Sequence, residues 1–312
     1  MALTSGLNTS SVKTAIDEFF YAPFDYSKQS GFATAENSLF FNQGSTQKQV
    51  VITEEFGGVG AFEVTSETEM PSEATIRSGN QKSRTVNTFD RNVPIPKRYF
   101  DDDQFDTVQK KVMELGQRAI TTRDSYAFDV YGSGFDGTLT NDGNYLWYDS
   151  HTSLNGGTID NLSSGAFTAT TFKTLWRLLI TQKAQDGEIG GHVPTGFLCA
   201  LNLIDTSHEV LKSDLKAGTA ENQLNYWSLA YPGLQIFTSA FLDSSYNDYT
   251  NINTAHFLVS GNHGIYRWVR AGLTTDMVPW QYDAKNRYIY KAEFREVCGA
   301  VSYFGAVAST GA

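Results

Sequence analysis

Hydrophobic residues follow a helical repeat most clearly between residues 104 and 131. Apolar and small side chains recur there at steps of three and four, the spacing that places them on one face of an α-helix. The positions are Phe105, Val108, Val112, Leu115, Ala119, Thr122, Tyr126 and Val130. Such a helix is about 42 Å long. We expect the first four of these positions to pack it on a sheet, three aspartates at 101–103 to cap it, and Gly132 to end it.

The remaining pattern mixes helices and strands. A second helix is predicted near 170–185 and a short one near 203–213. Strands are predicted at 197–201 and 234–239, as a pair around 256–271, and as alternating strands from 287 to 307. No repeating βαβ period connects them, which favours an α+β fold over a doubly wound α/β fold. Residues 1–50 are rich in Ser, Thr, Asn and Gln with isolated aromatics, which indicates an extended segment.

Between residues 54 and 98 the charge changes sign abruptly. Six glutamates come first without a basic residue among them, at positions 54, 55, 63, 67, 69 and 73; Arg77, Lys82, Arg84, Arg91, Lys97 and Arg98 follow, opposed only by Asp90. Thinly spaced apolar residues and Ser78-Gly79-Asn80-Gln81 as turn material predict a long β-hairpin whose two arms carry opposite charge.

A hairpin with so little apolar surface is not stable alone, so it must lie against something else. In one interpretation it is solvated and its arms simply pair with each other. In the other it is an arm that contacts a neighbouring subunit. The residues predicted to make such a contact are Glu63, Glu67, Glu69, Glu73, Arg77, Lys82 and Arg84.

Composition narrows the class of protein. The chain has 312 residues, 40% of them hydrophobic and 13% aromatic, which is too apolar for a disordered chain. No window approaches the roughly 18 consecutive apolar residues of a membrane helix and no signal peptide begins the chain, so we expect a soluble protein that is intracellular when made. The net charge of −10 argues against a sequence-reading nucleic-acid binder.

The candidate chemistry is sparse. Gly132, Gly134 and Gly137 match GxGxxG, but they follow a helix and open none, whereas a dinucleotide site needs the reverse order. The five histidines lack metal-ligand spacing, and Asp149-Ser150-His151 is too compact for a catalytic triad. Cys199 and Cys298 are expected to be buried thiols. We therefore predict no catalytic, metal or cofactor site.

The order of features resembles the tailed-bacteriophage major capsid proteins of the Hong Kong 97 type, over nearly the whole chain. The resemblance includes the polar N-terminal segment, the charged hairpin and the run from Val93 to Asp103 before the long helix. Within the middle region, Leu146–His151, Asn161-Leu162, Pro194–Leu198, Leu211–Ser213, Asn222 and Asn225 resemble Mu-like major head subunits.

The resemblance implies an extended N-terminal arm over 1–53 and an extended loop over 54–96. It implies a peripheral domain over 97–149 and 283–312 with a spine helix at 104–131, and an axial domain over 150–282. It implies a virion protein, assembled in the host bacterial cytoplasm, that forms pentamers and hexamers of an icosahedral shell around double-stranded DNA. Expected partners are other copies of the chain, a separate scaffolding protein, a portal protein, packaged DNA bound non-specifically and a possible decoration protein.

Two rivals remain. An encapsulin-like shell that encloses cargo enzymes usually has a helical N-terminus, whereas residues 1–50 here look extended. A polysaccharide-active β protein from a phage tail would show activity without assembly.

Overall fold

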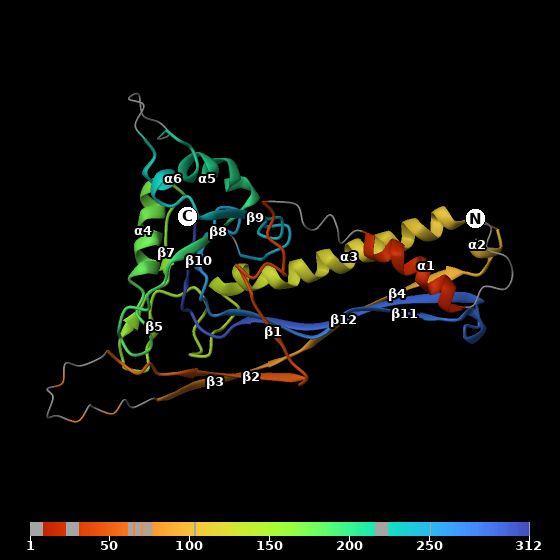
Figure 1. Ribbon diagram of the computed structural model, residues 1–312, viewed down its shortest axis with the longest axis horizontal. Helices are drawn as coiled ribbons and strands as arrows, with labels where there is room; N and C mark the ends of the chain where they lie inside the picture. The colour runs from red at the N-terminus through yellow and green to blue at the C-terminus, as the bar shows by residue number, and fades with distance from the viewer. Residues whose placement is uncertain are drawn as a thin grey trace.

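The computed structural model describes residues 9–22, 31–61, 65, 70, 73, 77–102, 104–215, 224–249 and 251–311. The molecule is elongated and has two parts, each built on its own sheet (Figure 1). We call them the long-sheet half and the five-stranded half. None of the helices within the described ranges is long and apolar enough to cross a membrane.

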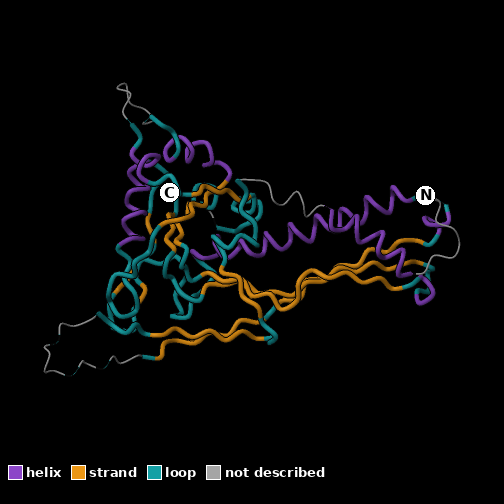
Figure 2. Tube along the Cα trace, viewed as in Figure 1, coloured by secondary structure: helices purple, strands orange, loops and turns teal. Residues whose placement is uncertain are grey.

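In the long-sheet half, one long helix lies along a four-stranded sheet (Figure 2). The helix is α3 (Phe105–Gly132), and the strands in order are β1 (Asn42–Ser45), β11 (Ile265–Val278), β12 (Arg287–Ala300) and β4 (Asn87–Pro96). The predicted spine helix is therefore confirmed to within one residue at each end. Its predicted aspartate cap is wrong, because the N-cap is Gln104, without a side-chain cap hydrogen bond, and Asp101 ends a separate helix, α2 (Arg98–Asp101).

The extended N-terminal arm predicted for residues 1–53 is wrong over its first described part. Residues Thr9–Tyr21 form helix α1. Its buried residues Val12, Ile16 and Phe20 recur every four positions and pack against α3 and the long sheet in one apolar cluster. The rest of that cluster consists of Ile95, Val108, Val112, Leu115, Met277, Tyr288, Tyr290 and Ala292.

The five-stranded half holds a mixed sheet and most of the shorter helices. The strands in order are β7 (Leu162–Ser163), β13 (Ala306–Ser309), β10 (His256–Ser260), β8 (Pro194–Ala200) and β9 (Gln235–Ser239). The helices are α4 (Ala169–Ile180), α5 (Ile204–Leu211) and α6 (Tyr226–Ala230). Thr168 caps α4 in a reciprocal capping box with Thr171, which satisfies backbone donors at the helix start. The α+β class is confirmed.

Strand pairing cuts across the predicted domain boundaries. Strand β11 lies within the range assigned to an axial domain, but it pairs with β12 in the long sheet. Strand β13 lies within the range assigned to a peripheral domain, but it pairs with β10 in the five-stranded sheet. The predicted pairing of strands around 256–271 is wrong for the same reason, because β10 and β11 belong to different sheets. The division into peripheral and axial domains stays a prediction.

An aromatic core joins the two halves at the C-terminal end of α3. It includes Phe40, Phe41, Phe128, Tyr131, Trp147 and Phe257, all at most 1% exposed. The Trp147 indole donates to the Tyr131 carbonyl at 2.8 Å, so the largest side chain of this core has its polar atom satisfied. A side chain at Gly134 would collide with the Trp147 ring, which explains this glycine as a close-packing position.

Candidate assembly surfaces

A two-stranded hairpin leaves the body between the two halves. Strand β2 (Val50–Phe56) pairs antiparallel with β3 (Ser78–Thr85), from Val50 opposite Thr85 to Phe56 opposite Ser78. The predicted turn at Ser78–Gln81 is wrong, because these residues lie in β3 and the two strands are joined through residues 57–77. The hairpin runs toward the five-stranded half, whereas β4, which follows it in the chain, runs the other way (Figure 1).

The two faces of β2 differ sharply. Val51 packs with Val86, Val297 and Trp268 in a small apolar cluster on the long-sheet half. On the opposite face, Ile52 is 65% exposed and Phe56 is 63% exposed, and Val59 beyond the strand is also exposed. Because large apolar side chains gather on one exposed side of a thin hairpin, this side is a candidate contact surface.

The predicted contact residues fall into three groups. Glu63, Glu67 and Glu69 lie outside the residues that the structure describes. Glu73 and Arg77 are exposed, and the Arg77 guanidinium donates to the Leu154 carbonyl at 3.2 Å. Lys82 donates to the Leu139 carbonyl at 2.9 Å, and Arg84 is buried, so the described basic residues are partly engaged within their own subunit.

Arg84, predicted to contact a neighbouring subunit, is buried within its own subunit, and its contact with another copy stays a prediction. Its guanidinium is buried and donates to the Thr53 hydroxyl at 2.6 Å, to the Asn141 amide oxygen at 3.1 Å and to the Ala300 carbonyl. Burial lowers the pKa of Arg84 to about 10, against the opposing effect of nearby Glu55. Because these three acceptors come from β2, a loop and the end of β12, Arg84 ties the hairpin to its own body.

Beside Arg84 lies a buried acid and imidazole pair that sequence reasoning missed. The Asp142 carboxylate lies 2.7 Å from His151 Nδ1, and the His151 ring stacks on Tyr303 with centroids 4.0 Å apart. Burial opposes ionisation of Asp142, but the hydrogen bonds from His151 and Thr140 outweigh it and hold the pKa of Asp142 at about 2. Nine residues separate the partners, so no local motif could have revealed the pair.

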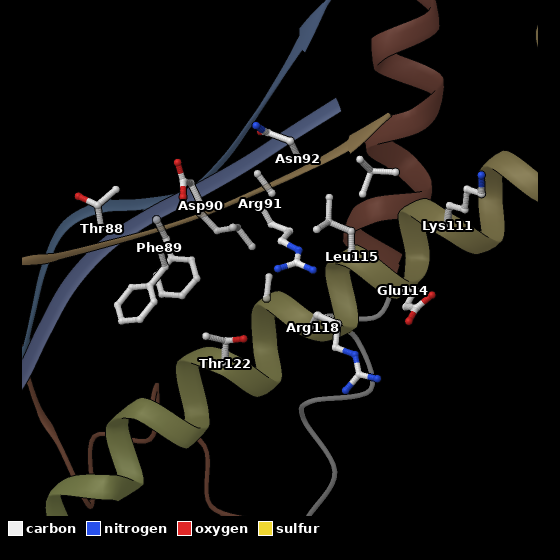
Figure 3. Close-up of a pocket in the computed structure, with 15 residues that line it drawn as sticks. Thr88, Phe89, Asp90, Arg91, Asn92, Lys111, Glu114, Leu115, Arg118 and Thr122 are labelled. Carbon is white, nitrogen blue, oxygen red and sulfur yellow. The ribbon is translucent and has the colours of Figure 1, made fainter. Parts of the chain in front are cut away.

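A groove of about 730 Å³ opens between α3 and β4. Figure 3 shows Arg91 and Phe89 directed from β4 toward the helix, whereas the guanidinium of Arg118 on α3 points away from β4 at the border of the groove. Strand β4 ends the long sheet, so no other strand of the described chain pairs with its outer edge. Within that part of the chain no ion pair or side-chain hydrogen bond of Arg91 or Arg118 is present. The lining also contains Lys111 and the two acids Asp90 and Glu114 around its apolar residues, so the groove carries charges of both signs with one more cation than anion.

The predicted core face of the spine helix borders this groove. Val108, Val112 and Leu115 are at most 5% exposed, whereas Phe105 is half-buried beside Phe100. Leu115 also lines the groove floor with Phe89 and Phe294, whose rings stack at 4.8 Å.

No metal-binding group of three or more His, Cys, Asp or Glu side chains occurs among the described residues. Cys199 and Cys298 are buried free thiols as predicted, and burial raises the pKa of Cys199 to about 11.

Comparisons with known proteins show the fold. No family model and no curated protein matches the sequence. Among solved structures, the capsid of Ralstonia phage GP4 matches with a TM-score of 0.54 at 11% identity, covering 90% of this chain and 89% of that one. The capsid of cyanophage P-SCSP1u matches with a TM-score of 0.54 at 12% identity, covering 90% and 89%. The virus-like particle from Pyrococcus furiosus matches with a TM-score of 0.53 at 7% identity, covering 96% and 98%. The predicted capsid fold of the Hong Kong 97 type is confirmed, and the Mu-like branch stays a prediction.

Proposed function

We propose that this chain is the major subunit of an icosahedral phage capsid, assembling as pentamers and hexamers of itself. The observation that carries the proposal is the match to phage capsid subunits over about nine-tenths of both chains. A fold shared at 11–12% identity does not by itself determine function, so features of this chain must support the same conclusion.

The hairpin supplies such a feature. A two-stranded ribbon is marginal alone, and β2 exposes Ile52 and Phe56 on the side turned away from the body. Burying these side chains against a second copy removes apolar area from water, at roughly 25 cal/mol per Å². In a closed shell every subunit has a neighbouring copy that can cover this face of β2, whereas in an isolated subunit Ile52 and Phe56 stay exposed to water.

We assign the groove between α3 and β4 of a second copy as the surface that receives the acidic part of the hairpin. The connecting segment contains Glu63, Glu67, Glu69 and Glu73, with one basic residue, Arg77, at its end. The groove offers three cations, Arg91, Lys111 and Arg118, beside two acids, Asp90 and Glu114. In Figure 1 the hairpin of β2 and β3 runs toward the five-stranded half, whereas β4 and the part of α3 whose residues line the groove extend the other way. The contact is then heterologous, the type that generates rings.

A charge swap tests this pairing. Reversing Arg91 and Arg118 to Glu should abolish closed particles. The control reverses the exposed Lys173 and Arg177 on α4 to Glu, which changes the net charge by the same amount, and it should still form particles. Adding Glu67→Arg and Glu69→Arg to the groove double variant should restore particles. Normal particles from the groove variant alone contradict the pairing.

The wider function includes partners that the fold does not identify. We propose a separate scaffolding protein, a portal protein, a possible decoration protein and non-specific contact with packaged double-stranded DNA, within a virion assembled in the host cytoplasm. The net charge of −10 supports weak, non-specific contact with DNA phosphates. The subunit is proposed to have a structural role without catalysis.

Electron microscopy of the purified full-length chain, with and without a crowding agent, tests the proposed function. We expect rings, sheets or closed shells of uniform diameter. A chain that stays a 34.5 kDa monomer by light scattering under all these conditions, and also when it is produced together with a scaffolding protein, contradicts it.

A compartment shell that encloses cargo enzymes is the second candidate. It is favoured by the match to the Pyrococcus furiosus particle over 96% of this chain. The sequence disfavoured this candidate because residues 1–50 look extended, but the structure has a helix, α1, in that region. The contents of purified particles distinguish the two, because a phage capsid made in infected cells holds DNA and a compartment holds a defined protein.

A further inference from the structure

Glu55 occupies an unusual position at the root of the hairpin. It is 5% exposed, and neither carboxylate oxygen accepts a hydrogen bond from any described residue. On the facing strand, a side chain at Gly79 would lie 2.6 Å from the Glu55 carbonyl, so β3 closes tightly over it. A buried carboxylate without hydrogen-bond donors is costly when ionised.

The charged and titratable groups around Glu55 come from every element packed against it. Strand β3 contributes Arg84 and Lys82, and Tyr303 follows β12. The loop before strand β5 (His151–Thr152) contributes Asp142, whose partner His151 is the first residue of β5. The Tyr303 hydroxyl is also buried without a hydrogen-bond partner among the described residues.

The two nearby cations do not neutralise Glu55 by direct contact. The Arg84 guanidinium is committed to Thr53, Asn141 and the Ala300 carbonyl, and Lys82 donates to the Leu139 carbonyl. The Asp142 carboxylate, by contrast, accepts from Thr140, Asn144 and His151. The surroundings of Asp142 therefore stabilise its ionised form, whereas those of Glu55 favour its neutral form.

We propose that Glu55 is a proton-controlled latch, which holds the hairpin on its own body when protonated and favours its release when ionised. The latch controls how firmly the hairpin of β2 and β3 docks on the body of its own subunit. Its consequence for assembly rests on the proposed function, because a released hairpin also frees Arg84 and the buried face of β2 for contact with another copy.

The ionisation equilibrium of Glu55 agrees with this geometry. Burial, followed by repulsion from Asp142, raises the pKa of Glu55 from 4.5 to about 7, against the attraction of Arg84. In a released hairpin the carboxyl is solvated and returns to its ordinary pKa. Docking is thus strongest below about pH 4.5, weakens as the pH rises, and has lost this contribution above about pH 7.

Hydrogen–deuterium exchange on the full-length free subunit tests the latch. Peptides covering β2 and β3 are followed from pH 5 to pH 8, with intrinsic exchange rates corrected and peptides of β11 and β12 as the internal reference. With a pKa of 4.5 in the released hairpin and about 7 in the docked one, hairpin opening should increase on the order of 70-fold between pH 5 and pH 8. Glu55→Gln should make hairpin protection independent of pH.

Glu54→Gln is the matched control, because Glu54 is the adjacent acid and already accepts a hydrogen bond from Gln81 at 2.9 Å. It should keep the wild-type pH profile. A flat wild-type profile overturns the latch whatever the variants do, and a Glu55→Gln profile that follows the wild type assigns the effect to another group. Shell formation is scored separately by electron microscopy, so failure of the proposed function leaves this result interpretable.

Discussion

The long-sheet half and the hairpin root are joined by opposite kinds of contact. Helix α3 rests on its sheet through Val108, Val112 and Leu115, side chains whose burial is favourable at any pH and needs no partner molecule. The hairpin root rests on Arg84 and a set of buried carboxyls, contacts that depend on protonation and on matched hydrogen bonds. The comparison indicates a rigid body that carries a conditional arm, which suits a subunit that must fold before it assembles.

The largest effect is expected in the rigid body. Leu115→Ala should destabilise the subunit by about 2–5 kcal/mol, because a nearly buried side chain leaves a cavity between α3, α1 and the sheet. Lys110→Ala, exposed on the same helix, should change the free energy of unfolding by less than about 0.5 kcal/mol. Urea unfolding measures both. Equal effects would mean that the apolar face carries no special weight.

At the hairpin root, Arg84→Ala should cost about 2–3 kcal/mol, because it leaves the Ala300 carbonyl and Asn141 without their charged donor. The loss should be local. Hydrogen exchange should show β2 and β3 exposed while β11 and β12 keep their protection. Simultaneous loss of protection in both sheets would contradict the division into body and arm.

Strong acid should weaken the body beside the root through the pair of Asp142 and His151, an effect separate from the docking of the hairpin by protonated Glu55. Because the pKa of Asp142 is lowered from 3.8 to about 2, the pair contributes stability above about pH 4 that is lost as the pH falls through 2. The contribution at neutral pH is about 2 kcal/mol. Asp142→Asn should flatten the acid limb of a stability profile measured by urea unfolding, and an unchanged limb would exclude this pair as its cause.

The smallest effect on stability is expected on the exposed face of β2. Ile52→Ser with Phe56→Ser should change the free energy of unfolding of the free subunit by less than about 0.5 kcal/mol, since both side chains are mostly in water. The same variant should fail to form particles under conditions in which the wild type assembles. Particles of normal yield and size would show that this face is not an interface.

Sequence pattern predicted the rigid body much better than the arm. The spine helix was predictable because its apolar period continues over seven turns, and α1 carried the same signal in Val12, Ile16 and Phe20, obscured by a polar composition. The separation of β10 from β11 was not predictable, since each strand pairs with segments far away in sequence.

The candidate site was harder to predict for a related reason. Arg84 looked like one charge among six in a basic run, and only its acceptors at Asn141 and Ala300, 57 and 216 residues away, make it an anchor. In the sequence Glu55 cannot be distinguished from its neighbour Glu54. In the structure β2 buries Glu55 against the body, whereas Glu54 accepts a hydrogen bond from Gln81.

The central claim is that the exposed side of the hairpin becomes an interface between copies. A reconstruction of assembled particles by electron cryo-microscopy, at a resolution that shows side chains, tests it most directly. We predict that Ile52 and Phe56 of each subunit lie buried against a different copy, with the acidic segment in that copy's groove beside Arg91. Particles in which both side chains face solvent, with the groove open, would contradict the account.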